Sequence, residues 1–179
     1  MDLEIIIEGC KHNSRTAQKA LYDRYLGTLY RLSLRYVRAV GDAEDCTSEA
    51  FVKIFEKIQT FDYQEINSFE VWIKQITINQ SLMCLRRRSS FLMLDISEAH
   101  DLGGEMFLDE NIDAKQILAL IKELPDGYRT VFNLYAIEGF QHNEIAKMVN
   151  ISENTSKTQL HKARLLLQKK LMSELGISR

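Results

Sequence analysis

Residues 144–167 read EIAKMVNISENTSKTQLHKARLLL. The first six of them predict a short amphipathic helix with a small residue, Ala146, in its middle. Asn150 follows this helix, and asparagine tolerates the left-handed backbone conformation that a tight helix exit needs. Ser152 is then placed to cap a second, longer helix. The stretch therefore predicts a helix-turn-helix.

The second helix of this motif has two different faces. Its inward face is predicted from residues that recur every three or four positions, namely Ser156, Leu160, Ala163, Leu167 and Leu171. Residues 153–170 hold five Lys or Arg against one Glu, so the helix carries four net positive charges. Such a helix suits the DNA major groove, where amides and cations reach base edges and phosphates, although the same pattern would fit an exposed helix of a bundle. The residues predicted to meet DNA are Glu153, Asn154, Thr155, Lys157, Thr158, Gln159, His161, Lys162 and Arg164.

The composition of the 179-residue chain allows one medium domain or two small ones, because 45% of it is hydrophobic and 27% is charged. Eight Gly and a single Pro leave little turn chemistry for a sheet of several strands, whereas helix-forming residues are abundant. We therefore predict an all-α fold.

Several classes of protein are not indicated by the sequence. The three cysteines are odd in number, far apart and without a CxxC or a His at zinc-ligand spacing, so we expect reduced, mostly buried thiols and no metal or other cofactor. Apolar runs stay short of the roughly 18 residues of a membrane span, and the acidic start lacks a basic signal region, so we expect a cytoplasmic protein without membrane insertion. With a net charge of −2, any DNA binding must be local and assisted.

Charge divides the chain into two halves. Residues 95–113 hold seven Asp or Glu, no Lys or Arg, and the pair Gly103 and Gly104, which is typical of a linker. The sequence predicts a first helical domain over residues 1–90, an acidic linker over 91–112 and a second helical domain over 113–179. No internal repeat joins the two halves.

The first half is predicted to hold three packed helices. The first runs from Ser14 to Val40 and is ended by Gly41. The second covers residues 42–58, with acidic residues in its first turn, where the helix dipole favours them. A loop over residues 61–68 follows, and Ser68 caps a third helix that reaches the three arginines at 86–88.

Four blocks of the chain carry a family resemblance. They are DAEDCTSEAF at 42–51, VWIKQITIN at 71–79, LRRR at 85–88, and LPDGYRTVF at 124–132 followed by the helix-turn-helix. In order and spacing they resemble the extracytoplasmic-function sigma factors of bacterial RNA polymerase. The resemblance implies a specificity subunit without catalytic groups. Such a subunit docks on core polymerase, at its β′ clamp helices and β flap, and directs it to promoter DNA.

The acidic block resembles the helix by which sigma factors grip the β′ clamp helices. The residues implied there are Asp42, Asp45, Glu49 and Lys53. Exposed carboxylates are suited to pairing with basic residues of a partner. For Asp42, stabilisation of its own helix N-terminus explains the residue equally well. Ser48 stands where the family usually shows Gln, so one contact is shortened or absent.

The third helix and the loop before it supply the residues implied for the minus-ten element. On the helix, an aromatic ring, amides and cations share one side, a combination that suits an unpaired DNA strand. The loop resembles one that captures a flipped base. Trp72 fits a core position equally well, and Val71 replaces the second tryptophan of primary sigma factors, which implies weaker melting and stricter promoter choice. The residues are Tyr63, Gln64, Asn67, Trp72, Lys74, Gln75, Asn79, Arg86 and Arg87.

Three departures from the family fall in the helix-turn-helix. Ser156 stands where Val or Ile is usual, Asn150 replaces a glycine of the turn, and Gln141 and His142 stand where a Ser or Thr cap usually opens the motif. A small inward residue still fits the position of Ser156, so we interpret it as a subfamily trait.

The resemblance also implies partners and leaves alternatives. The acidic linker would pass through the RNA exit path of polymerase, or would act only as a solvated spacer. An anti-sigma factor is the expected regulatory partner. The main alternative is a stand-alone helix-turn-helix regulator, which would bind duplex DNA by itself, usually as a dimer. An all-helical enzyme has little support, since no phosphate loop, HExxH or other catalytic motif is present.

Overall fold

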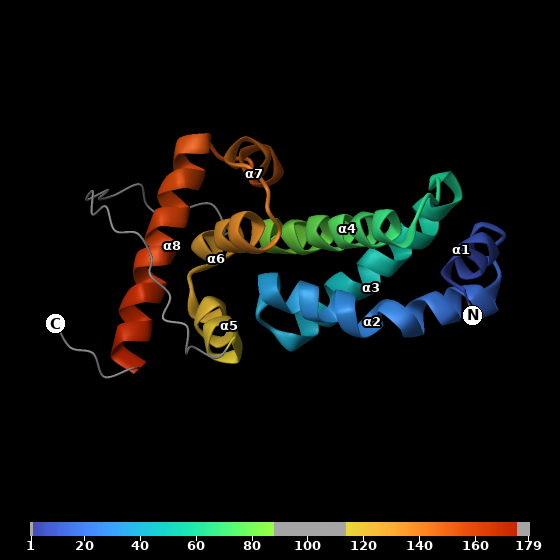
Figure 1. The fold of residues 1–179 in the computed structure, drawn as a ribbon, viewed down its shortest axis with the longest axis horizontal. Coiled ribbons are helices and arrows are strands. Elements are labelled where there is room, and N and C mark those ends of the chain that lie inside the picture. The colour runs from blue at the N-terminus through green and yellow to red at the C-terminus, as the bar shows by residue number, and fades with distance from the viewer. Residues whose placement is uncertain (1, 88–113, 175–179) are drawn as a thin grey trace. The chain divides into compact units, whose positions relative to one another are not determined.

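The computed structural model describes residues 2–87 and 114–174. In those two ranges all regular elements are helical, so the predicted all-α class is confirmed (Figure 1). The chain divides into two compact units, Met1–Arg88 and Ser89–Arg179, which we call unit 1 and unit 2. The predicted acidic linker over 91–112 lies outside the described residues. None of the described helices is both long and apolar enough to cross a membrane.

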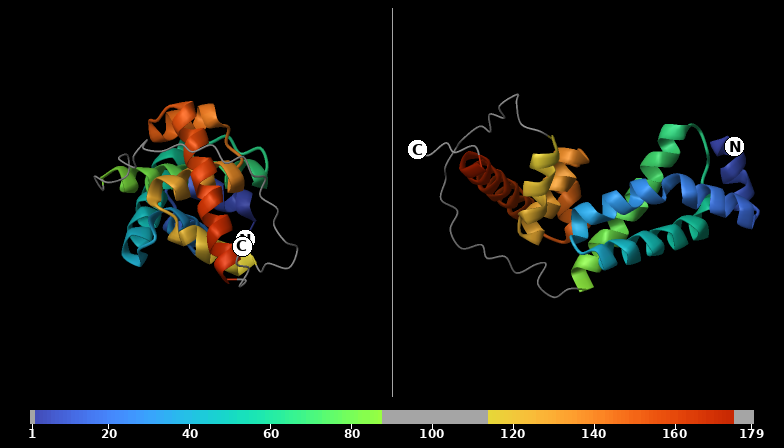
Figure 2. Two further views of the ribbon diagram at one scale, coloured as in Figure 1. Left: turned by 90° about the vertical axis from the view of Figure 1, so that its left-hand side faces the viewer. Right: turned by 90° about the horizontal axis from the view of Figure 1, so that it is seen from below.

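Unit 1 is a bundle of three long helices with one short helix at its N-terminus. Its elements are α1 (Leu3–Lys11), α2 (Arg15–Val37), α3 (Val40–Lys57), the short 3-10 turn η1 (Ile58–Thr60) and α4 (Ile66–Arg87). Helices α2, α3 and α4 each pack against the other two, and α1 covers α2 and η1 (Figures 1 and 2).

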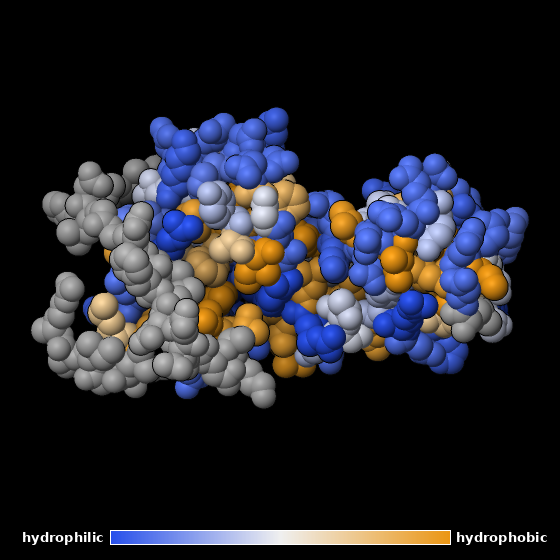
Figure 3. Space-filling view, in the orientation of Figure 1, coloured by the Kyte–Doolittle hydropathy of each residue, from blue (hydrophilic) through white to orange (hydrophobic). Residues whose placement is uncertain are grey.

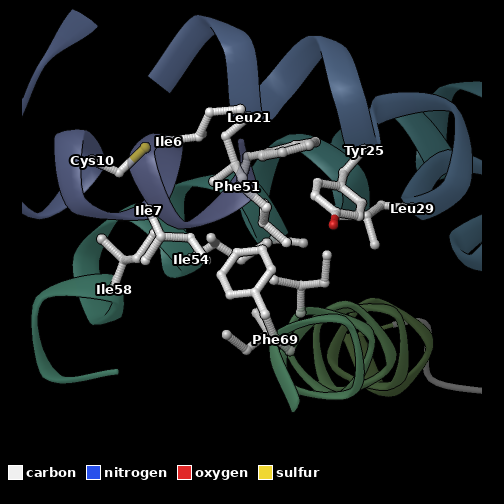
Figure 4. Close-up of a cluster of buried hydrophobic side chains, with 14 of the residues drawn as sticks. Ile6, Ile7, Cys10, Leu21, Tyr25, Leu29, Phe51, Ile54, Ile58 and Phe69 are labelled. Atoms are coloured by element: carbon white, nitrogen blue, oxygen red, sulfur yellow. The ribbon is translucent and has the colours of Figure 1, made fainter. Parts of the chain in front are cut away.

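The core of unit 1 is continuous and strongly apolar. Figure 4 shows α1 inserting Ile6, Ile7 and Cys10 toward Ile54 and Ile58 at one end of the core. Phe69 of α4 is also fully buried in this core, with its ring centroid 5.9 Å from that of Tyr25 on α2. These contacts hold α4 in a fixed rotation about its axis, which decides the side chains that it presents to solvent.

Two predicted helix boundaries in unit 1 are wrong, and one helix lies outside the predicted helical region. The first helix ends at Val37, where Arg38 takes a positive φ of 43° and the Ala39 N–H donates to the Val37 carbonyl oxygen. Gly41 is predicted to end that helix but lies in the first turn of α3. Glycine can adopt the conformation that ends a helix, but it can also take the helical conformation.

The start of α4 and the whole of α1 also differ from prediction. Helix α4 begins at Ile66, and the Ser68 hydroxyl donates to the Glu65 carbonyl oxygen at 2.7 Å, so Ser68 closes the first turn from inside the helix. Helix α1 precedes the predicted helical region. Its buried residues recur at helical spacing: Leu3, Ile6, Ile7 and Cys10.

Unit 2 is built from shorter elements around one long helix. They are α5 (Ala114–Glu123), α6 (Asp126–Phe132), the π-helical turn η2 (Asn133–Ile137), α7 (His142–Val149) and α8 (Glu153–Glu174). Helix α8 packs against α5, α6 and α7. The predicted inward residues of α8 are all buried, which confirms that stripe.

A buried arginine ties the first two helices of unit 2 together. Arg129 is 1% exposed, and its guanidinium donates to the Leu124 carbonyl oxygen at 2.9 Å and to the Asp126 carboxylate at 2.8 Å. The first bond satisfies a carbonyl at the end of α5, and the second fixes the start of α6. Arg129 therefore serves the fold and is not available to a ligand.

Candidate nucleic-acid interfaces

The turn between α7 and α8 has the predicted geometry. Asn150 adopts the left-handed conformation, with φ 57° and ψ 52°. Behind it the Ile151 N–H donates to the Ala146 carbonyl oxygen at 3.0 Å. The Ser152 hydroxyl accepts from the Thr155 N–H at 3.0 Å, as an N-cap does. These contacts fix the direction in which α8 leaves α7.

Helix α7 begins at His142, before the predicted Glu144. The Glu144 carboxylate accepts from the Gln141 N–H at 2.8 Å, so a glutamate at the third helical position satisfies a backbone donor at the helix start. This interaction replaces the Ser or Thr cap whose absence left the boundary open in the sequence.

Ser156 is inward and fully buried, and its hydroxyl lies 2.8 Å from Nδ1 of His142. The His142 ring stacks on Tyr135 with the ring centroids 4.6 Å apart, and the Arg164 guanidinium lies 5.9 Å from the Tyr135 ring. Burial, and then the positive charge of Lys157, lowers the pKa of His142 below its usual value. The neutral imidazole thus provides a hydrogen-bond partner for the buried Ser156 hydroxyl. An apolar residue at position 156 would need no such partner.

The outward face of α8 is polar and only partly exposed. Glu153, Asn154, Lys157 and Arg164 are exposed, whereas the remaining predicted DNA contacts are half-buried: Thr155, Thr158, Gln159, His161 and Lys162. Figure 3 shows a hydrophilic surface over α7 and the first turns of α8. The Gln159 amide lies close to the α carbon of Gly127 on α6, where a methyl group would approach it to 3.3 Å, so this side chain also contributes to packing.

Helix α4 carries the second set of candidates. Asn79, Arg86 and Arg87 are exposed, and Gln75 donates its amide to the Asn79 amide oxygen at 3.3 Å. Lys74 is half-buried, as is Tyr63 in the segment before α4, whereas Gln64 and Asn67 are exposed. All nine predicted minus-ten residues therefore lie on α4 or in the segment directly before it.

Trp72 combines the two interpretations that the sequence left open. Its ring packs against Phe61 and Phe69, with ring centroids 4.6 Å and 5.7 Å away, yet the residue is only half-buried. One part of the indole thus belongs to the core, and the remainder faces solvent.

Comparison with known proteins assigns both units. The family model described as Sigma-70 region 2 matches residues 21–91, and the model described as Sigma-70, region 4 matches residues 114–167. The ECF RNA polymerase sigma factor SigW of Bacillus subtilis is 29% identical over 178 residues, which cover 92% of this chain and 94% of SigW. This chain belongs to the extracytoplasmic-function sigma factors. It is accordingly an RNA polymerase sigma factor for transcription initiation, as the resemblance implied.

Two further relatives agree with this assignment of the sigma factor. The ECF RNA polymerase sigma-E factor of Escherichia coli strain K12 is 26% identical over 181 residues, which cover 94% of this chain and 93% of that protein. The structure titled "Structure of CnrH in complex with the cytosolic domain of CnrY" matches 96% of this chain and 99% of that chain. Its TM-score of 0.51 at 19% identity supports the fold.

The acidic helix of the sigma factor, α3, carries the third set of candidates. Asp45 is exposed and Asp42 is half-buried in the first turn. Lys53 pairs with Glu56 at 2.7 Å on the same helix. The Ser48 hydroxyl donates to the Glu44 carbonyl oxygen at 2.9 Å, so this short side chain is bonded to its own helix.

One ion pair joins two candidate surfaces of the sigma factor. The Glu49 carboxylate on α3 lies 3.2 Å from the Arg87 guanidinium at the end of α4. The two residues are 38 positions apart and were assigned to different partners, polymerase and DNA. Both side chains are well exposed, so the pair contributes at most about 1 kcal/mol to stability and is easily exchanged for other partners.

The cysteines of the sigma factor are reduced, and two of the three are buried, as predicted. Burial raises the pKa of the Cys10 thiol to about 11. Burial, and then the neighbouring Cys84 thiol, raises the pKa of Cys46. In the described ranges no three His, Cys, Asp or Glu side chains gather as metal ligands would.

Sequence reasoning missed two kinds of residue. Tyr135 of η2 and His142 of α7 stack on each other and support α8. Neither residue belongs to a sequence motif that would predict this contact. Arg24, Tyr25 and Glu70 surround a cavity between α2 and α4. Their helical spacing predicts only an amphipathic face, so the sequence held no signal for a cavity.

Proposed function

We propose that this sigma factor reads the minus-thirty-five element with α8. The supporting observation is the basic, exposed face of α8 that directly follows a turn fixed by Asn150 and Ser152. Asn154 and Lys157 lie in the first turns of α8, where recognition helices contact base edges, and both are exposed. Lys162 and Arg164 lie further along and are placed to neutralise phosphates.

Unit 1 is proposed to hold the melted minus-ten strand. The half-exposed indole of Trp72 offers a stacking surface, and each stacked base contributes about 1 to 3 kcal/mol. Gln75 and Asn79 offer amides for base edges, and the exposed cations at the end of α4 meet the backbone. The segment before α4, with Tyr63 and Gln64, is proposed to receive a flipped base.

The first turns of α3 are proposed to dock on the β′ clamp helices. Asp45 is the principal contact because it is exposed and lies beyond any role in stabilising its own helix start. Glu49 would exchange Arg87 for a basic residue of polymerase, while Asp42 and Lys53 flank the contact. The β flap is the proposed partner of unit 2, and the linker over 91–112 is proposed to follow the RNA exit path.

The remaining proposals concern the cellular role. The sigma factor is proposed to act in the cytoplasm as a specificity subunit that leaves all catalysis to polymerase. CnrH, whose fold unit 1 and unit 2 share, is titled as a complex with the cytosolic domain of CnrY. We extend this kind of regulation to the present chain and propose an anti-sigma partner that occupies its docking surfaces.

The test is reconstituted transcription. The purified chain is added to core polymerase on a library of host promoters, and transcript starts are mapped. We expect a defined set of starts that core polymerase alone does not produce. Asp45→Lys should reduce these transcripts, whereas Asp23→Lys should not, since Asp23 is an exposed acid on α2 outside all proposed contacts.

Two outcomes would oppose the proposal. The absence of any defined start would refute it. Binding to duplex DNA by the protein alone, without an effect on where polymerase initiates, would instead support the stand-alone regulator.

A further inference from the structure

Unit 1 contains a cavity that none of the three candidate surfaces uses in full. Its volume is about 270 Å³, and it lies between α2 and α4. The lining residues are Arg24, Tyr25, Thr28 and Leu29 from α2, and Glu70, Ile73 and Lys74 from α4. Lys74 also belongs to the predicted minus-ten residues, so the cavity adjoins the surface proposed to hold the melted strand.

The cavity is apolar at its base and charged at its edge. Leu29 and Ile73 are buried, at 0% and 2% exposed. Arg24 is exposed and its guanidinium lies 5.7 Å from the Tyr25 ring, while Lys74 and Glu70 are half-buried. Two cations thus offset one carboxylate, and the edge keeps a net positive charge that suits a phosphate backbone.

The carboxylate is held in a defined position. The Tyr25 hydroxyl donates to Oε1 of Glu70 at 3.4 Å, and Tyr25 is itself 5% exposed. Burial, and then the charge of Glu70, raises the pKa of Tyr25, so the phenol remains a donor. A carboxylate has about four acceptor sites. Glu70 therefore keeps acceptor capacity for a ligand in the cavity.

We propose that this cavity binds one unpaired nucleotide of the melted promoter strand and selects a base with an exocyclic amino group over thymine. The inference rests on the proposed minus-ten role of unit 1. It adds a second base site, separate from the one proposed for the segment before α4.

Three properties support this ligand. The volume lies just below the range of about 300 to 1,000 Å³ that drug-sized ligands occupy, which suits a ligand of the size of one base. The apolar base of the cavity accommodates the flat face of a ring, and the cations at its edge meet the phosphates. The Glu70 carboxylate accepts from the amino group of cytosine or adenine, whereas thymine offers only a carbonyl oxygen there.

The test uses polymerase reconstituted with the full chain and a promoter that it transcribes. Forked DNAs carry cytosine, thymine or an abasic residue at one unpaired non-template position at a time, and their affinities are compared. At one position we expect cytosine to be favoured over thymine by roughly 5- to 150-fold. Glu70→Gln should bring this ratio close to one at that position only, because its amide also donates to the thymine oxygen.

Two matched variants complete the test. Asp23→Asn changes a neighbouring exposed acid that does not line the cavity, and it should leave the ratio unchanged. Thr28→Tyr places a ring at the exposed mouth. It should weaken binding of the cytosine fork and leave binding of the abasic fork unchanged.

Two results would overturn the inference. One is a cytosine-to-thymine affinity ratio that Glu70→Gln changes at no position. The hydrogen bond between Tyr25 and Glu70 would then only hold α2 and α4 together. The other is a Thr28→Tyr protein that binds the cytosine fork like the wild type. Failure of the proposed function is distinguishable from both, because no promoter would then be transcribed and no fork would bind.

Discussion

The two units hold their candidate DNA surfaces by different means. In unit 1 the long helices α2, α3 and α4, of 23, 18 and 22 residues, share a continuous apolar core. In unit 2 the helices α5, α6 and α7 have 10, 7 and 8 residues. A short helix leaves a larger share of its backbone groups without partners inside the helix. In unit 2, Arg129 satisfies one such group, the Leu124 carbonyl oxygen at the end of α5.

The outward faces of α4 and α8 also differ. The outward face of α4 combines part of an indole with amides, and its cations lie mainly at its end. The outward face of α8 carries cations along much of its length. A stacking surface and amides therefore characterise the candidate surface of α4, and charge characterises that of α8. Mutations that remove one kind of interaction should affect the two units unequally.

The largest expected effect is from Phe69→Ala in unit 1. Phe69 is fully buried and contacts Tyr25, Phe61 and Trp72, so truncation should lower the free energy of unfolding of unit 1 by about 3 to 5 kcal/mol. Trp72 is the only tryptophan of the chain, and the denaturant midpoint of its fluorescence reports unit 1. Val71→Ala, at an exposed neighbour, should change the free energy by less than about 0.5 kcal/mol. Equal effects of the two variants would contradict the apolar account of unit 1.

Arg129→Met is the corresponding change in unit 2. It removes both guanidinium bonds and should cost unit 2 about 3 kcal/mol, although it keeps most of the apolar stem. Far-UV circular dichroism should show an earlier loss of helix, while the Trp72 midpoint stays unchanged. Lys122→Met, at an exposed position of α5, serves as the control. A shift of the Trp72 midpoint by Arg129→Met would show that the two units unfold together.

The parts of the fold that the sequence predicted are those fixed by local chemistry. The inward stripe of α8, the left-handed Asn150 and the Ser152 cap each follow from residue types at short spacing. The helix boundaries predicted at Gly41 and Ser68 were wrong because each residue type can take more than one role. Glycine can end a helix or lie in its first turn, and a serine hydroxyl can close a turn from inside the helix.

The candidate site was predicted as three sets of residues, which lie on α3, on α8, and on α4 with the segment before it. The contacts between elements were beyond prediction, because they depend on how helices pack. The Glu49 to Arg87 pair, the stack of His142 on Tyr135 and the cavity beside Glu70 all join segments distant in sequence. The roles of these residues in binding polymerase and DNA are predictions.

A smaller effect separates the two DNA surfaces. Arg164→Ala removes an exposed cation of α8 that is proposed to neutralise a phosphate, so it should weaken minus-thirty-five duplex binding by reconstituted polymerase and reduce the salt dependence of that binding by about one unit of log slope. Asn79→Ala on α4 should weaken binding to a forked minus-ten DNA and leave its salt dependence unchanged, because an amide releases no counterion. Affinities measured over a series of salt concentrations decide between them. Equal losses of slope in both variants would remove the proposed difference between the surfaces.

The smallest expected effect is a pH dependence confined to unit 2. Because the pKa of His142 is lowered in the folded protein, the unfolded chain binds a proton at this residue first as the pH falls. The contribution of His142 is therefore fully present above its unfolded pKa of about 6.5 and is lost as the pH drops toward the lower folded value. Thermal unfolding followed by circular dichroism at about pH 7.5 and about pH 5.5 should show this loss in the wild type.

Two variants test whether this loss of stability comes from the contact between His142 and Ser156. His142→Gln cannot titrate, so unit 2 of this variant should lose less stability than the wild type over the same interval. Ser156→Ala removes the hydroxyl bond and should cost about 0.5 to 1.5 kcal/mol at the higher pH. The Trp72 midpoint should differ little between the wild type and His142→Gln at either pH, since His142 belongs to unit 2. An unchanged pH dependence in His142→Gln would mean that another group is responsible for the loss of stability. The hydrogen bond to Ser156 would then not depend on the protonation of the His142 ring.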